Sequence, residues 1–184
     1  MIDPVRFDTL FLDRDGVINT LRPKDYVKAW EEFEFIPGSI EALGMLASLF
    51  RHIIVVTNQR GVGRGVMTEQ DLQTIHNKML QEIQRGGGRI DRIYVCTAVD
   101  DRDPNRKPNI GMALRAHSDF PDIDFFRSVV VGDSATDMEF GKRIGAACVW
   151  IGTGSDRGEP SFESLYAFAE DYAHRVETKD FTGF

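Results

Sequence analysis

The sequence predicts an α/β fold in which helices cover both faces of a doubly wound parallel sheet. Short apolar and β-branched runs alternate along the chain with segments of helical periodicity. The run His52–Thr57 has four consecutive apolar residues, which is typical of a strand buried on both faces. Strands that alternate with helices connect through right-handed crossovers, and such crossovers produce a parallel sheet.

The first strand and helix lie in the first 50 residues. Phe7–Leu12 is an expected strand that stops at Asp13. A helix follows Pro37-Gly38, because Ser39 can cap it. Its apolar positions recur at helical spacing and are Ile40, Leu43, Ala47 and Phe50.

The next unit has the same strand–helix order. After His52–Thr57, the segment Asn58–Met67 is rich in Gly and Arg and is expected to be a loop. Thr68–Asp71 forms a capping box in which Asp replaces the usual Glu. The helix that follows has one apolar face, made by Leu72, Ile75, Met79 and Ile83, and Gly86-Gly87-Gly88 end it.

The rest of the chain repeats the pattern. We expect strands at Ile93–Cys96, Ser128–Val131 and Ala147–Ile151, a polar loop at Asp100–Asn109, and helices at Ile110–Ser118, Thr136–Ile144 and Ser161–Arg175. A length of 184 residues favours one domain over residues 1–184, with residues 176–184 as an unassigned tail in which Phe181 and Phe184 could dock.

Composition excludes several classes of protein. The 29 acidic and 22 basic residues give a net charge of −7, which disfavours a nucleic-acid binder. Two cysteines cannot build a disulfide framework. The N-terminus does not resemble a signal peptide, and no segment approaches the roughly 20 apolar residues that span a bilayer. We therefore expect a cytoplasmic monomer without a membrane partner.

The residues that follow the strands indicate the chemistry, because open α/β sheets bind ligands beyond the carboxyl ends of their strands. They are Asp13 and Asp15 after the first strand, Thr57 and Asn58 at the second, Lys107 after the third, and Asp133 and Asp137 after the fourth. Carboxylates packed closely repel each other and have raised pKa values unless a cation offsets them. Mg²⁺ is the commonest such cation when the substrate also brings phosphate oxygens.

Each of these residues also has an ordinary explanation. An Asp-X-Asp pair is usually a solvated turn, and Thr57 at a strand end usually bonds to the backbone. Lys107 before Pro108 would usually be a surface lysine, and Asp133 or Ser134 could cap the next helix. A common site is favoured because suitable side chains follow all four strands, in the order given above.

Four motifs together resemble the haloacid dehalogenase (HAD) superfamily. They are FLDRDGVIN (residues 11–19), VVTNQRGVGRG (55–65), RKPNIGM (106–112) and VGDSATDM (131–138). Within that superfamily, the chain is similar to the histidinol-phosphatase and D,D-heptose 1,7-bisphosphate phosphatase group. TNQRGVGRG and EFEFIPG (32–38) favour the heptose branch. The resemblance implies a Rossmann-like HAD fold and a Mg²⁺-dependent phosphatase of carbohydrate metabolism.

The resemblance also implies a role for each motif residue. Asp13 is then the nucleophile that forms an aspartyl-phosphate, and Asp15 is the general acid and base. Thr57, Asn58 and Lys107 hold the transferring phosphoryl group, and Arg106 helps to grip the substrate. Asp133 binds Mg²⁺ together with Asp13 and the backbone carbonyl of Asp15, and Asp137 supports this metal site from behind these ligands. Because Asp15 must first be protonated, we expect its proximity to Asp13 to raise its pKa.

One segment departs from the family pattern. Usual members carry a zinc loop of several Cys and one His before the lysine, whereas this chain has CTAVDDRDPNRK (96–107), in which Cys96 is the only cysteine. We therefore expect no structural zinc. Asp100, Asp101 and Asp103 could make turns or a weak cation site.

The spacing between motifs leaves no room for a cap domain, so loops must select the substrate, which we expect to be a small phosphorylated sugar. The candidate loop residues are Arg22, Lys24 and Tyr26, with Arg60 and Arg64 as a clasp for a second phosphate. The alternative for Arg60 and Arg64 is a solvated, flexible loop.

Other functions share parts of this pattern. Histidinol phosphate is an alternative substrate, and polynucleotide 3′-phosphatases also carry these motifs, although the acidic charge disfavours them. A non-enzymatic phospho-acceptor or binding module is the alternative of a different class. Receiver domains of that class lack an acid two residues after the acceptor, and Asp15 therefore favours an enzyme.

Overall fold

The computed structural model describes residues 6–153 and 158–181, and in this part of the chain six parallel strands form one sheet. The strands are β1 Thr9–Leu12, β2 His52–Asn58, β3 Arg92–Cys96, β4 Ser128–Gly132, β5 Ala147–Ile151 and β6 Ser161–Phe162. The helices are α1 Ser39–Leu46, α2 Arg60–Gly63, α3 Glu69–Arg85, α4 Gly111–Asp119, α5 Ala135–Ile144 and α6 Leu165–Thr178, with 3-10 turns at Trp30–Glu32 and Phe125–Arg127. This confirms the doubly wound α/β fold.

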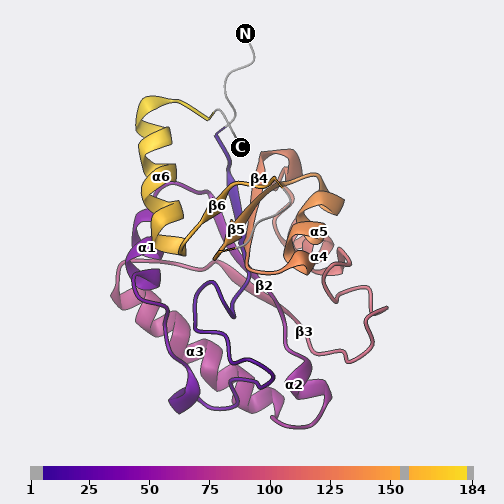
Figure 1. Cartoon of the computed structure of the whole chain (residues 1–184). Helices are drawn as coiled ribbons and strands as arrows, with labels where there is room; N and C mark the ends of the chain where they lie inside the picture. Colours follow the sequence, from indigo (N-terminus) through magenta and orange to yellow (C-terminus); the bar gives the residue numbers. More distant parts are fainter. Residues whose placement is uncertain (1–5, 154–157, 182–184) are drawn as a thin grey trace.

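The strand order β3-β2-β1-β4-β5-β6 puts β1 at the centre of the sheet. The chain winds outward from β1 to β3 and then returns to start β4 on the other side of β1 (Figure 1). A ligand crevice forms where the winding reverses, beyond the carboxyl ends of β1 and β4. The backbone N–H of Asp13 donates to the carbonyl of Val131 at 3.0 Å, which ties the end of β1 to the end of β4.

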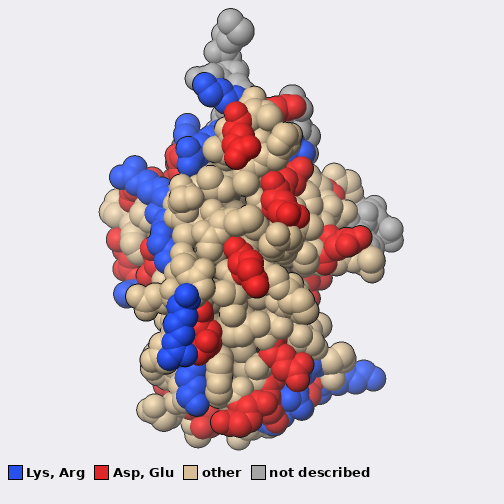
Figure 2. Space-filling view, turned by 90° about the vertical axis from the view of Figure 1, so that its left-hand side faces the viewer, with Lys and Arg blue, Asp and Glu red and all other residues tan. Residues whose placement is uncertain are grey.

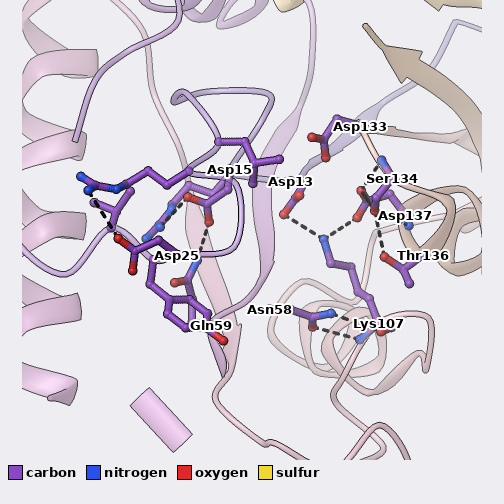
Figure 3. A pocket seen from close by; sticks show the side chains of 15 residues that line it. Asp13, Asp15, Asp25, Asn58, Gln59, Lys107, Asp133, Ser134, Thr136 and Asp137 are labelled. Carbon is purple, nitrogen blue, oxygen red and sulfur yellow. Dashed lines mark hydrogen bonds and ion pairs between the residues drawn. The ribbon is translucent and has the colours of Figure 1, made fainter. Parts of the chain in front are cut away.

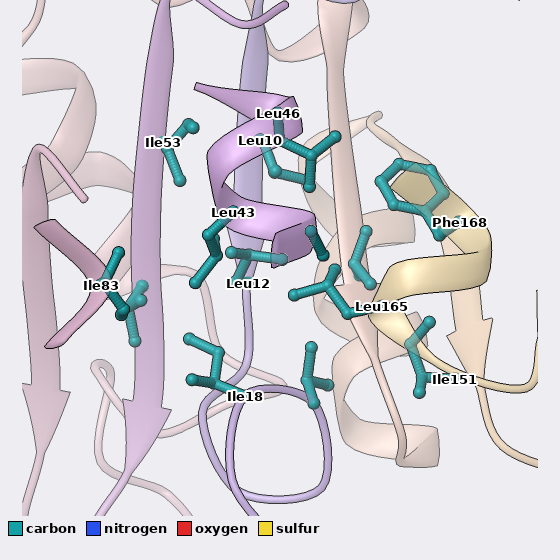
Figure 4. Packing of buried hydrophobic residues seen from close by; sticks show 14 of the residues in the cluster. Leu10, Leu12, Ile18, Leu43, Leu46, Ile53, Ile83, Ile151, Leu165 and Phe168 are labelled. Atoms are coloured by element: carbon teal, nitrogen blue, oxygen red, sulfur yellow. The ribbon is translucent and has the colours of Figure 1, made fainter. Parts of the chain in front are cut away.

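Two apolar layers cover the sheet, and β1 contributes to both. Leu10 and Leu12 point into the layer that α1, α3 and α6 cover, whereas Phe11 points into the layer under α4 and α5. Figure 4 shows the first layer, where Leu43 of α1 and Leu165 of α6 pack over the strands. All four residues of β1 are buried, so the strand that carries Asp13 is held rigidly on both faces.

Two helix starts follow capping signals in the sequence, but the expectation that Ser39 caps α1 was wrong, because Gly38 holds the cap position and the Ser39 hydroxyl makes no capping hydrogen bond. Thr68 accepts from the backbone N–H of Asp71 at 3.0 Å, and Asp71 accepts in return from the N–H of Thr68 at 2.8 Å. A second capping box links Ser134 and Asp137 at the start of α5. Each box satisfies backbone N–H groups that have no partner inside the helix.

Three further expectations about the elements were wrong. The segment Ser161–Phe162 is an edge strand and not the start of the last helix, because Ser164 is the residue that caps α6. Arg60–Gly63, expected to be loop, forms a short helix. Helix α1 ends at Leu46, so Phe50 reaches the core from the turn after the helix.

The last helix holds the N-terminal segment in place. The hydroxyl of Tyr172 accepts from the backbone N–H of Phe7 at 3.1 Å and donates to the Phe7 carbonyl at 3.2 Å. Its ring stacks on Phe50 with centroids 4.6 Å apart, and Phe181 from the tail lies 5.9 Å away. Phe181 therefore docks on α6, whereas Phe184 lies outside the described residues.

The surface agrees with the acidic composition. On the face in Figure 2, acidic side chains are scattered among uncharged ones, and basic side chains lie mainly along one edge. This face has no broad basic patch of the kind that tracks a phosphate backbone. Among the helices that the structure describes, none combines the length and apolar character needed to cross a bilayer.

Removing the Tyr172 hydroxyl tests how strongly α6 holds the N-terminal segment. We expect Tyr172→Phe to lower the free energy of unfolding by about 1 kcal/mol, because two buried hydrogen bonds to Phe7 are lost. Tyr172→Ala should cost about 3–5 kcal/mol, because it also leaves a cavity. Urea denaturation measures both values. Tyr166→Phe on the same helix is the control with little expected effect, and equal losses for Tyr166→Phe and Tyr172→Phe would contradict this account.

Candidate active site

A cavity of about 340 Å³ opens at the carboxyl ends of β1, β2 and β4. Its walls come from the segments after these strands and from the loop before α1. The lining residues are Asp13, Arg14, Asp15, Leu21, Arg22, Asp25, Tyr26, Val27, Asn58, Gln59, Lys107, Asp133, Ser134, Thr136 and Asp137. Most of the predicted site residues therefore meet in one place.

Lys107 lies at the centre of this site. Its Nζ donates to Oδ1 of Asp13 at 2.9 Å and to Oδ1 of Asp137 at 2.6 Å (Figure 3). The lysine side chain is only 2% exposed. Burial lowers the pKa of Lys107, but the two carboxylates outweigh burial and raise it above its usual value. The ammonium therefore stays charged at any physiological pH.

Asn58 fixes the backbone of Lys107. Its amide oxygen accepts from the Lys107 N–H at 3.1 Å, and its amide nitrogen donates to the Lys107 carbonyl at 3.2 Å. Asn58 is the last residue of β2, so this pair of bonds connects the loop after β3 to the sheet. The side chain that was expected to hold a phosphoryl group thus also positions the lysine.

Three carboxylates form a close group at this site. Oxygen atoms of Asp13, Asp133 and Asp137 all lie within 4.8 Å of one another. Burial, opposed by Lys107 and reinforced by the neighbouring carboxylates, raises the pKa of Asp13 to about 8. Burial and Asp137 raise the pKa of Asp133 to about 6. The raised pKa values expected for closely packed carboxylates are thus found at these two residues, with burial as the largest cause.

The donor set suits a hard divalent cation. Three carboxylates provide oxygen ligands, and one lysine cannot neutralise all of them. A cation among them would lower the raised pKa values of Asp13 and Asp133. In the part of the chain that the structure describes, no other group of three or more His, Cys, Asp or Glu residues comes as close together.

Two glycines make room for these carboxylates. A Cβ atom on Gly16 would lie 1.9 Å from Oδ2 of Asp133, and the φ angle of Gly16 is +87°. A Cβ atom on Gly132 would lie 2.3 Å from the Cβ of Asp137. A side chain at either position would push a carboxylate out of the group, so glycine is needed at both for steric reasons.

Asp137 has two functions in the structure. One oxygen accepts from Lys107, whereas Oδ2 accepts from the backbone N–H of Ser134 at 3.1 Å and from its hydroxyl at 2.5 Å. Asp137 is thus also the acidic partner in the capping box of α5. Of the two residues that could have capped this helix, Ser134 is the cap, whereas Asp133 lines the cavity.

Asp15 lines the same cavity but points away from Lys107, toward Gln59 (Figure 3). Its Oδ1 accepts from Arg14 at 2.8 Å and from Asn19 at 2.9 Å, and its Oδ2 accepts from Gln59 at 2.8 Å. Burial raises the pKa of Asp15, but Arg14 and the hydrogen bonds outweigh it, and the pKa lies below its usual value. The expectation of a raised pKa was therefore wrong. The carboxyl group is stabilised as an anion by a buried guanidinium and two amides.

Sequence reasoning overlooked the residues that hold Asp15. Gln59 donates to Thr57 as well as to Asp15, both at 2.8 Å, and so connects the ends of β1 and β2. Asn19 is completely buried. Both residues belong to the motifs given above, and this position in the sequence was the signal that they lie near the site. Their spacing alone does not show which acidic side chain they contact.

The loop arginines do not line the cavity. Arg60 and Arg106 both pair with Asp101, and Arg106 lies 2.9 Å from that carboxylate. Arg64 donates to the hydroxyl of Tyr26 at 3.0 Å. Of the charged residues expected in the flap, Arg22 lines the cavity whereas Lys24 does not. The structure therefore gathers Arg60 and Arg106 around Asp101, beside the site.

The segment that departs from the family pattern is held by turns and ion pairs. Oδ1 of Asp103 accepts from the backbone N–H of Asn105 at 2.8 Å, and Asp100 pairs with Arg102. Asp101 joins the loop to α2 through Arg60. The turns expected at these aspartates are confirmed.

Comparison with known proteins supports a common ancestry. The HAD-hydrolase-like family model matches residues 104–174. The D-glycero-α-D-manno-heptose-1,7-bisphosphate 7-phosphatase of Mycobacterium tuberculosis is 40% identical over 173 residues, which cover 90% of this chain and 91% of that protein. The D-glycero-β-D-manno-heptose-1,7-bisphosphate 7-phosphatase of Rhodopseudomonas palustris is 38% identical over 143 residues, 73% of this chain and 78% of that protein.

Solved structures of heptose-bisphosphate phosphatases have the same fold as this chain. The D,D-heptose 1,7-bisphosphate phosphatase of B. bronchiseptica, complexed with magnesium and phosphate, superimposes with a TM-score of 0.83 and 30% identity and covers 91% of this chain and 99% of that one. The enzyme of Burkholderia thailandensis gives a TM-score of 0.67 with 29% identity, over 90% of this chain and 97% of that one. With the site geometry, these likenesses show that the chain belongs to the heptose-bisphosphate phosphatase family of the HAD superfamily and is a phosphatase.

Proposed function

We propose that this phosphatase hydrolyses D-glycero-D-manno-heptose 1,7-bisphosphate at position 7, with Mg²⁺, through an aspartyl-phosphate on Asp13. The observation that carries the proposal is the placement of Asp13. Its carboxylate ends the central strand, pairs with a buried lysine and belongs to a group of three acids that suits a divalent cation. The named activity of relatives at about 40% identity supports the choice of substrate.

In the first step, a carboxylate oxygen of Asp13 attacks phosphorus, and the bond from phosphorus to the sugar oxygen breaks. Asp15 gives its proton to the leaving oxygen. In the second step, water attacks phosphorus, the bond to Asp13 breaks, and Asp15 takes the proton of the water. Such covalent catalysis divides one difficult hydrolysis into two easier steps. Lys107, Thr57 and Asn58 orient the phosphoryl group and stabilise its charge.

The group of acids supplies the metal site in this proposal. Asp13, Asp133, Asp137 and the backbone carbonyl of Asp15 would hold Mg²⁺, which when bound offsets negative charge on the phosphoryl group and on the carboxylates. Lys107 supplies a second, permanent positive charge next to Asp13.

Asp15 needs to change protonation state between the two steps. Arg14, Asn19 and Gln59 stabilise its anion, which is the form that accepts a proton from water. The first step needs the acid, and the negative charge of an arriving phosphate ester raises the pKa of a carboxyl group beside it. Substrate binding therefore opposes the effect of Arg14 and favours the protonated form when it is needed.

A second phosphate needs a cation at the cavity wall. Arg22 lines the cavity and is partly exposed, with Asp25 at 3.4 Å and Glu32 at 3.6 Å as its partners. Arg60, Arg64 and Arg106 stay candidates, but each would first have to leave Asp101 or Tyr26. Of these four arginines, Arg22 is the one that already lines the cavity, and it is thus our first candidate for the second phosphate.

Replacing the nucleophile tests the covalent mechanism. We expect Asp13→Asn to reduce kcat at least about 10³-fold, because an amide does not form the phosphoenzyme. The fold should survive, because Asp137 still pairs with Lys107. Phosphate release measures turnover, and circular dichroism measures folding. The control is Asp8→Asn, which removes an exposed carboxylate before β1 that pairs with Arg127. Near wild-type turnover in Asp13→Asn would refute the mechanism.

Metal removal tests the proposed metal site at Asp13, Asp133 and Asp137. Chelation should stop turnover, and added Mg²⁺ should restore it with little change in the melting temperature. A structural zinc would behave differently, because its removal unfolds the loop that binds it. Elemental analysis of protein purified without added metal is the direct check. Stoichiometric zinc in that sample would overturn this expectation.

Kinetics on a substrate panel tests the substrate. We expect kcat/KM to be higher for heptose 1,7-bisphosphate than for histidinol phosphate or other sugar phosphates. Arg22→Ala should reduce kcat/KM about 10–100-fold on the bisphosphate but little on heptose 7-phosphate, because a charged hydrogen bond contributes about 1.5–3 kcal/mol.

Arg60→Ala and Arg64→Ala are the matched comparisons for Arg22→Ala. A larger bisphosphate-specific loss in either would place the second phosphate at the glycine-rich loop instead. A clear preference for histidinol phosphate would contradict the proposed substrate.

A further inference from the structure

Arg14 is a completely buried arginine next to the catalytic aspartate of the proposal. It is 0% exposed and is the largest fully buried side chain in the described residues. Its NH2 group donates to Asp15 at 2.8 Å, and its guanidinium lies 5.9 Å from the ring centre of Phe33. The Nε atom has no hydrogen-bond partner. A buried charge with so few partners depends strongly on each of them.

The other partner of Arg14 is His76, which comes from helix α3. NH1 of Arg14 and Nε2 of His76 are 3.1 Å apart, and the imidazole is buried. A guanidinium can only donate, so Nε2 accepts and carries no proton, which leaves the proton of the neutral ring on Nδ1. Burial and the charge of Arg14 lower the pKa of His76 to about 3. The ring is therefore a neutral acceptor at working pH.

We propose that His76 is a positioning residue, which acts through Arg14 to hold the Asp15 carboxylate where it exchanges a proton with the substrate. The inference rests on the proposed role of Asp15. His76 lies outside all four motifs and 61 residues after Asp15 in the chain. The contact runs from α3 through Arg14 to Oδ1 of Asp15, with no other residue between.

The effect follows from the geometry of the guanidinium. His76 holds NH1 and Asp15 holds NH2, so the two contacts together set the orientation of the planar group. Without the imidazole, NH1 loses a buried acceptor and the guanidinium can turn toward another one. Asp15 would move with it, and a displacement of about 1 Å of a catalytic group can cost about 10²-fold in rate.

The ordinary alternative is that His76 only packs in the core. It occupies the buried face of α3 together with Leu72, Ile75, Met79 and Ile83. A packing residue can be replaced by an apolar side chain of similar size without loss of turnover. A positioning residue cannot, but it tolerates another hydrogen-bond acceptor.

The first test compares His76→Leu with His76→Gln in the full-length enzyme. We expect His76→Leu to lower kcat about 10–100-fold with KM within about 2-fold, and His76→Gln to restore most of kcat, because its amide oxygen can accept from Arg14. Ile83→Ala, which removes buried side-chain volume elsewhere on α3, is the control for lost stability. Unchanged kcat in His76→Leu, or equal losses in His76→Leu and His76→Gln, would overturn the proposal.

A double-mutant cycle tests whether His76 acts through Asp15. In an Asp15→Asn background, measured in single turnovers at high enzyme concentration, His76→Leu should cause no further loss. If His76→Leu lowered the single-turnover rate by the same factor in both backgrounds, the positioning role would be overturned. Near wild-type kcat in Asp15→Asn alone would instead refute the proposed function, so the two failures are distinct.

A third measurement does not depend on activity or on a variant that folds. Nitrogen-15 NMR of the histidine rings in the wild-type enzyme should show His76 as the neutral Nδ1–H form between about pH 5 and 8. A proton on Nε2 would contradict the contact with Arg14 and overturn the proposal.

Discussion

The buried ammonium of Lys107 is the interaction on which the site depends. It joins Asp13 at the end of β1 to Asp137 at the start of α5, and Asn58 of β2 holds its backbone. Three segments that are far apart in the sequence thus contact the same lysine residue. A buried ammonium is tolerated only when its partners are close, so the lysine requires both carboxylates to stay in place. The sheet order meets this requirement, because β1 lies between β2 and β4.

Rigid backbone brings the acids together against their own repulsion. Two glycines leave space for Asp133 and Asp137, and the capping box anchors Asp137 to its helix. Burial and the neighbouring carboxylates raise the pKa of Asp13 to about 8, which shows the cost of this arrangement. The pKa of Asp15 is shifted in the opposite direction, because Arg14 lowers it. Two carboxylates two residues apart therefore have different environments, which suits their different proposed roles, nucleophile and proton carrier.

The sequence predicted the sheet and most of the site because both depend on local signals. Apolar runs mark the strands, and Asp13, Lys107 and Asp137 follow strand ends whose order brings them together. The direction of the Asp15 side chain could not be predicted, because it depends on a buried arginine, and nothing in the spacing shows that Arg14 is buried. His76 is a similar case, since a histidine on an apolar helix face does not reveal its partner 62 residues away. The ion pair between Arg60 and Asp101 could not be predicted either, because the sequence does not show that this loop carboxylate lies next to Arg60.

Phosphopeptide mapping after rapid acid quench tests the central claim most directly, since it asks which atom receives the phosphoryl group. The enzyme is mixed with substrate labelled in the phosphate at position 7, quenched in acid during the first turnover and digested. The account predicts label on the peptide that contains Asp13, as an acyl phosphate that hydroxylamine releases. Label on another residue, or turnover without any labelled protein at the earliest times, would contradict it.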